Sequence, residues 1–181
     1  MLHLFVCKMA KKKLKEELEQ YDYVDDEYID EVSPDYIEAI GLFVLNFSAL
    51  EHQLNIEIAE KINPSNHLFG YQIVELLSAK SKIDLFSRLI NSWIFFSNKE
   101  LKTKGIYILS KLKGFNSFRN KVIHANWMSL RKDGTVRTSM AVDDNGEVQF
   151  ERTKLTSEII NKKSEEISKF LEELEEFIDL L

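Results

Sequence analysis

Residues 33–62 read SPDYIEAIGLFVLNFSALEHQLNIEIAEKI, and this stretch decides the fold class. Ser33 is a favourable N-cap and Pro34 suits the first turn, so we expect a helix to begin here. Asn63-Pro64 predicts its end near Ile62, because proline disfavours helical geometry in the residue before it. Apolar residues recur at intervals of three and four, which predicts a helix with one buried face. They are Ile40, Phe43, Val44, Phe47, Leu50, Leu54 and Ile58.

The rest of the chain favours helix as well, since it holds only two prolines and six glycines. A second helix is expected over roughly residues 71–96, a third over 99–127 and a last one over 157–180, capped by Thr156. The inward face of the second is predicted to comprise Ile73, Leu76, Leu77, Ile83, Phe86, Leu89, Ile90 and Trp93.

Between the last two helices the period changes. Residues 127–153 contain β-branched, alternating segments and two hairpin signals, Asp133-Gly134 and Asn145-Gly146. We therefore predict a mainly α protein, an antiparallel bundle of four main helices with an inserted three-stranded antiparallel β-meander. Residues 33–181 are expected to form one domain, preceded by a charged arm over residues 1–32.

Cysteine usage and hydropathy bear on the cellular location. Cys7 is the only cysteine, so no disulfide can form within one chain, which fits a reducing cytoplasm. The most apolar stretch, LINSWIFF, is far too short to span a bilayer. We expect a soluble, cytoplasmic protein that does not contact a membrane.

Charge is distributed unevenly along the chain. Taken over the whole chain, the net charge of −6 argues against a nucleic acid as the binding partner. Residues 98–138, however, contain ten lysines and arginines against two acidic residues, a local balance of +8. A local basic face is what a phosphate-binding protein requires, so this segment predicts RNA as a partner. The alternative is a set of solvated lysines on ordinary helices.

Several common chemistries have no signature here. The chain lacks the glycine-rich loops that hold phosphates and the elbow that carries a nucleophilic serine. Its histidines show no metal-ligand spacing within a helix; they are His3, His52, His67 and His124. We therefore expect neither a metal nor a cofactor.

Two charged residues stand on the apolar sides of their helices. In FRNKVIHANW (residues 118–127), Arg119 falls among apolar positions, and Glu51 lies between Phe47 and Leu54 in the first stripe. Buried charges are normally paired, so we expect Arg119 and Glu51 to meet across the core. Either the pair fixes helix register, or Glu51 orients a guanidinium that lines a cleft.

The same segment holds residues suited to phosphodiester chemistry. The planar guanidinium of Arg119 can stabilise an anionic phosphorane, and the imidazole of His124 can transfer a proton near neutral pH. Asn120 and His124 are separated by four residues, so the amide can orient the imidazole or contact substrate. These groups suffice for attack of a ribose 2′-hydroxyl on the adjacent phosphodiester without a metal.

The segment RNKVIH resembles the motif of HEPN domains, which consists of an arginine, a polar residue and a histidine a few positions later. The order of the expected helices in residues 34–181 is also similar to that of HEPN domains. The resemblance implies a metal-independent endoribonuclease that acts as a homodimer, with a composite cleft between two motif helices. Arg119 would stabilise the transition state, His124 would transfer protons and Asn120 would support them. It also implies a toxin or antiphage abortive-infection effector, with an antitoxin or regulatory protein as a further partner.

One subgroup of this family carries tyrosine two residues after the histidine, where this chain has Asn126. Trp127 can stack on a base or pack inside the protein. Together with Lys113, Lys121 and Asn126 it completes the expected RNA contacts. The alternative is a catalytically silent HEPN-like module that binds RNA, a nucleotide or a protein; a plain helical interaction protein is a third possibility.

Overall fold

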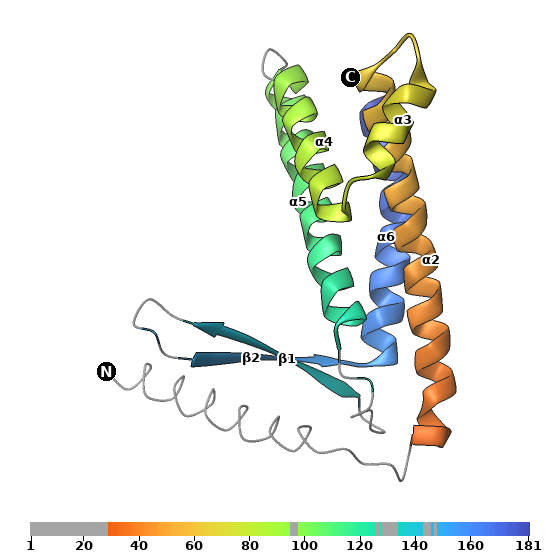
Figure 1. Ribbon diagram of the computed structural model, residues 1–181, viewed down its shortest axis with the longest axis vertical. Helices are drawn as coiled ribbons and strands as arrows, with labels where there is room; N and C mark the ends of the chain where they lie inside the picture. The colour runs from red at the N-terminus through yellow and green to blue at the C-terminus, as the bar shows by residue number, and fades with distance from the viewer. Residues whose placement is uncertain (1–28, 95–97, 126, 128–133, 143–145, 147) are drawn as a thin grey trace. The chain divides into compact units, whose positions relative to one another are not determined.

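The computed structural model describes residues 29–94, 98–125, 127, 134–142, 146 and 148–181. The described chain is mainly helical, so the predicted fold class is confirmed at that level. Its helices are α2 (Ile29–Ile62), α3 (His67–Glu75), α4 (Ala79–Ile94), α5 (Lys99–Ile123) and α6 (Ser157–Ile178), and its strands are β1 (Thr135–Val142) and β2 (Val148–Leu155) (Figure 1). No helix in these ranges is both long and apolar enough to cross a bilayer. Most of the predicted arm, residues 1–28, lies outside the described ranges.

Residue contacts divide the chain into two compact units. Unit one comprises Met1–Ile40 and Lys121–Ile160, and unit two comprises Gly41–Asn120 and Asn161–Leu181. Unit one therefore contains the two strands, together with the start of α2, the last residues of α5 and the first residues of α6.

Unit two contains four long helical segments, from α2, α4, α5 and α6, whose side chains pack against one another. Phe43 of α2 packs edge-on against Phe118 of α5, with ring centroids 5.4 Å apart. Phe115 makes a similar contact with Phe170 of α6 at 5.2 Å. The buried Ser164 of α6 accepts a hydrogen bond from Asn46 at 2.8 Å. Buried apolar residues of α2, α4, α5 and α6 thus form the core of unit two.

The first helix begins earlier than the sequence predicts. α2 starts at Ile29, and Pro34 lies inside it, so the prediction of a cap at Ser33 is wrong. Pro34 is the sixth residue of α2, so it cannot donate the hydrogen bond that a helix would form to the carbonyl group of Asp30. The predicted end at Ile62 is confirmed, and so is most of the buried stripe; Val44 is exposed instead.

The helix predicted over residues 71–96 is in fact two helices. The helix is interrupted at Ser78, because the Oγ atom of Ser78 accepts a hydrogen bond from the backbone N–H of Ser81 and so caps the start of α4. Asn66 caps α3 in the same way, since its side chain accepts a hydrogen bond from the backbone N–H of Phe69. As a consequence Ile73 and Leu76, expected inside, are exposed, Leu76 to 88%.

Helix α3 touches α2 through a glycine. A Cβ on Gly70 would lie 2.4 Å from the carbonyl oxygen of Ala59, so no other residue fits without moving the backbone. Near this end of α2, the ammonium group of Lys61 stands 5.0 Å from the centre of the Trp93 ring of α4.

The β segment has two described strands. β1 and β2 pair antiparallel with Thr135 opposite Leu155 and Val142 opposite Val148. Gly146 in the connection has φ +81°, as its predicted turn requires. A third strand of the predicted meander is not found among the described residues, and residues 128–133 of that segment lie outside the described ranges. Gly134, before β1, has φ +124°, and a Cβ there would lie 2.6 Å from the Leu155 carbonyl oxygen.

Candidate functional site

Helix α5 positions the predicted motif. Its first turn is capped by Asn98, whose Oδ1 accepts a hydrogen bond from the backbone N–H of Leu101 at 2.9 Å. The helix then runs to Ile123. Arg119 and Asn120 lie in its last two turns, and His124 follows its last residue with an exposed side chain. The expected helix end at Trp127 is therefore a few residues too late.

Arg119 is half-buried and makes one local polar contact. Its Nη1 group donates a hydrogen bond to Oδ1 of Asn120 at 3.2 Å. Among the described residues no carboxylate forms an ion pair with this guanidinium. Most of its donors are therefore available to an anionic ligand. Asn120 thus contacts the arginine, whereas the sequence suggested a contact with His124 or substrate.

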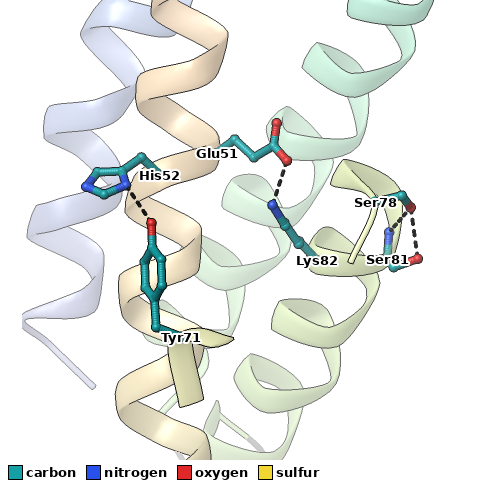
Figure 2. A network of polar contacts seen from close by, with 6 residues as sticks. All are labelled: Glu51, His52, Tyr71, Ser78, Ser81 and Lys82. Atoms are coloured by element: carbon teal, nitrogen blue, oxygen red, sulfur yellow. Dashed lines mark hydrogen bonds and ion pairs between the residues drawn. The ribbon is translucent and has the colours of Figure 1, made fainter. Parts of the chain in front are cut away.

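Glu51 has a different partner from the one expected. Its Oε1 accepts a hydrogen bond from the ammonium group of Lys82 at 2.7 Å, in an ion pair that joins α2 to α4 (Figure 2). The Lys82 side chain is only 6% exposed and that of Glu51 is 30% exposed. The predicted pairing of Glu51 with Arg119 is therefore wrong.

Helix register explains the difference. Phe43 is the α2 residue whose ring contacts Phe118, next to Arg119. Glu51 lies eight residues further along α2, which is about 12 Å at the rise of an ideal helix. The sequence places Glu51 on the correct face of α2 but cannot give the level at which α5 packs against it.

The sequence analysis did not predict Lys82 as the partner of Glu51. It precedes Phe86 and Ile90 at intervals of four, so it belongs to the apolar stripe of α4. A lysine in such a stripe is the same signal that identified Glu51. On another side of α2, His52 Nδ1 and the hydroxyl of Tyr71 form a hydrogen bond of 3.3 Å (Figure 2).

The predicted RNA contacts have different environments. Lys113 is exposed on α5, Lys121 is half-buried, and Asn126 lies outside the described residues. Within unit one, Trp127 Nε1 donates to the carbonyl oxygen of Val122 at 2.9 Å. The indole also contacts the ring of Tyr36, with centroids 5.9 Å apart. Of the two alternatives for Trp127, the structure therefore contains the packing contact.

Helix α6 adds a cation beside the motif helix. The ammonium group of Lys163 stands 5.8 Å from the centre of the Phe118 ring and 5.9 Å from that of Phe115. It also donates a hydrogen bond to Glu166 at 2.6 Å, which lowers the pKa of that carboxyl below its ordinary value. Lys163 was not predicted, because its neighbours come from distant parts of the sequence.

A cavity of about 300 Å³ opens at the other end of α5, lined by Asn98, Glu100, Leu101, Lys104 and Leu180. Asn98 precedes Arg119 by 21 residues, about 30 Å along an ideal helix, so this cavity is separate from the motif. Within the described ranges no group of three or more histidine, cysteine or acidic side chains is placed to hold a metal ion.

Comparison with protein-family models, with curated proteins and with solved structures found no match for this chain. The resemblance to HEPN domains therefore depends on the residues of the motif and on the order of the helices.

Proposed function

We propose that this chain is a metal-independent endoribonuclease of the HEPN type, in which Arg119 and His124 act on RNA. The observation that carries the proposal is the half-buried guanidinium of Arg119, which has no carboxylate partner within the described residues. Holding a cation partly out of water without a counter-charge is unfavourable, and an anionic ligand would relieve that cost. The exposed imidazole of His124 follows five residues later.

The proposed reaction is an intramolecular transesterification. The 2′-oxygen of a ribose bonds to the adjacent phosphorus, and the bond from phosphorus to the 5′-oxygen of the next nucleotide breaks. The 2′-hydroxyl loses its proton and the leaving 5′-oxygen gains one; His124 carries out one of these two transfers and solvent water the other. Arg119 stabilises the charge that develops on the phosphoryl oxygens. Asn120 orients the guanidinium. The proposed reaction does not use Glu51, whose carboxylate is paired with Lys82.

The surface of α5 supports RNA as the substrate. Lys113 is exposed, and no ion pair of this lysine occurs within the described part of the chain. Near it, Gly114 and Ser117 are exposed and small, and a Cβ on Gly114 would meet no other atom within 4 Å. Such a face permits close approach of a phosphodiester backbone or of α5 from a second copy. We propose the second arrangement as the homodimer that completes the cleft.

The biological setting that we propose follows from this chemistry. A ribonuclease that needs no cofactor is active wherever it meets RNA, so it requires control. A toxin or antiphage effector restrained by an antitoxin or regulatory protein satisfies that requirement.

A cleavage assay on total RNA and tRNA in excess EDTA tests the proposal. We expect the wild type to produce fragments that end in a 2′,3′-cyclic phosphate. Arg119→Ala and His124→Ala should each lower the rate at least about 100-fold, the usual contribution of such groups. Lys169→Ala, which removes an exposed lysine of α6, is the matched control and should retain activity.

Circular dichroism of each variant separates loss of chemistry from loss of fold. Cleavage that survives both substitutions would contradict the assignment. A folded wild type that binds RNA without cleaving it would instead identify the silent binding module.

A further inference from the structure

Lys163 is a cation in the apolar stripe of α6. It lies between Ile160 and Ile167, at helical intervals of three and four, and both isoleucines are fully buried. Its ammonium group stands over the rings of Phe115 and Phe118 of α5, and its side chain is 28% exposed. An apolar side chain would pack at this position without any loss of hydration. The ammonium group therefore indicates a site for an anion.

The carboxylate of Glu166 is the anion that this structure places there, and three lysines act on it. It accepts a hydrogen bond from Lys163 at 2.6 Å. That hydrogen bond is the largest cause of its lowered pKa, and the charges of Lys111 and Lys162 lower the pKa further, whereas burial opposes them. Within the described ranges neither Lys111 nor Lys162 forms an ion pair. One carboxylate cannot pair with all three, which we call the lysine group (Lys111, Lys162 and Lys163).

Arg119 extends these cations along α5. It follows directly after Phe118, whose half-buried ring lies 5.8 Å from the ammonium group of Lys163. All of these residues belong to unit two. Cations that alternate with aromatic rings are typical of surfaces that bind single-stranded nucleic acid, because the cations contact phosphates and the rings contact bases.

We infer that the lysine group binds a phosphate group of an RNA strand, next to the phosphate that Arg119 contacts. On binding, this phosphate replaces the Glu166 carboxylate as the counter-ion of Lys163. The inference rests on the proposed function, because its ligand is the RNA strand that the motif would cleave. It adds a binding subsite whose residues take no part in proton transfer.

Two substitutions separate such a subsite from an ordinary ion pair. Lys163→Met removes a phosphate ligand and leaves an apolar side chain in the stripe, and Glu166→Gln removes the competing carboxylate. A phosphate subsite predicts opposite changes in RNA affinity, since the first variant loses a cation and the second frees one. A purely structural ion pair predicts no change beyond that of the matched charge controls. These are Lys80→Met and Glu75→Gln, both at exposed positions.

The probe is a single-stranded 2′-O-methyl RNA of about 12 nucleotides, and fluorescence anisotropy measures its Kd at several salt concentrations. It has no attacking hydroxyl, so its affinity can be measured whether or not the chain cleaves RNA. We expect Lys163→Met to raise the Kd about tenfold and to lower the slope of log Kd against log salt by about 0.7. Glu166→Gln should lower the Kd severalfold. Circular dichroism and thermal unfolding establish that each variant is folded.

Values of Kd that neither substitution changes beyond its charge control would overturn the inference. A probe that does not bind the wild type would also overturn it, and would leave the lysine group to an acidic protein segment. The cleavage assay decides the proposed function separately. If cleavage occurs and the Kd values do not change, only the subsite fails. If the Kd values shift in opposite directions and no cleavage occurs, only the ribonuclease fails.

Discussion

At the scale of single residues, unit two contains one buried ion pair whose members differ in burial. Lys82 is almost fully enclosed, whereas Glu51 keeps part of its carboxylate in contact with solvent. The cost of losing one partner therefore differs between the two. The remaining lysine would be a buried charge without a counter-ion, and the remaining glutamate could still bind water.

We expect Glu51→Leu to lower the free energy of unfolding by roughly 3 kcal/mol, and Lys82→Met to lower it by less. The double variant should return to within about 1 kcal/mol of the wild type, because an apolar pair needs no counter-charge. Urea unfolding followed by circular dichroism measures all three. Equal losses in the two single variants would contradict the asymmetry.

A second buried acid makes stability depend on pH. Glu57 is 8% exposed, and burial raises its pKa above the ordinary 4.5, with Glu60 adding to the effect and a hydrogen bond from Gln53 opposing it. The folded protein thus holds this proton more tightly than the unfolded chain. Its stabilising contribution is present at low pH and is lost as the pH rises through the folded pKa.

Glu57→Gln removes this charge and preserves the shape of the side chain. We expect the variant to be more stable than the wild type at pH 7, and the difference to shrink as the pH falls toward 4.5. Thermal unfolding between pH 4 and pH 8 gives the comparison. Glu75→Gln, at an exposed position of α3, is the control and should show a smaller difference.

At the scale of elements, short polar residues decide where helices start. The hydroxyl of Ser78 caps α4 and also lies 2.9 Å from the hydroxyl of Ser81. Ser78→Ala should lower the free energy of unfolding by about 1 kcal/mol, the usual contribution of such a cap. Ser110→Ala, at an exposed position inside α5, should be neutral or slightly stabilising because alanine favours helix.

Caps also mark the limit of what the sequence predicts. The start of α6 was predicted from Thr156, whose Oγ1 accepts a hydrogen bond from the backbone N–H of Ile159. The equivalent signal at Ser78 was hidden, because apolar residues continue on both sides of it. The spacing of apolar residues identifies which residues are helical and which face of the helix is buried. A break between two helices that share one spacing can be predicted only by recognising the capping residue.

For the candidate site, the sequence predicted which face of a helix each residue lies on better than it predicted which residues of two helices are in contact. Both Glu51 and Arg119 are partly buried polar residues on helices, as the stripes indicate. Their expected contact fails, because the level at which two helices pack depends on side chains such as Phe43 and Phe118 rather than on either helix alone. Pairing across a core is therefore the step at which sequence patterns stop being informative.

At the scale of the whole molecule, each of the two units contains one of the chain's two tryptophans. Trp127 lies against Tyr36 in unit one, and Trp93 lies near Lys61 in unit two. Each unit consequently has its own natural fluorophore. In Trp93→Phe, tryptophan emission reports on unit one alone, because Trp127 is then the only tryptophan in the sequence. Comparing the melting curve of this emission with that of the circular dichroism of the whole chain therefore tells whether both units melt in one transition or in two.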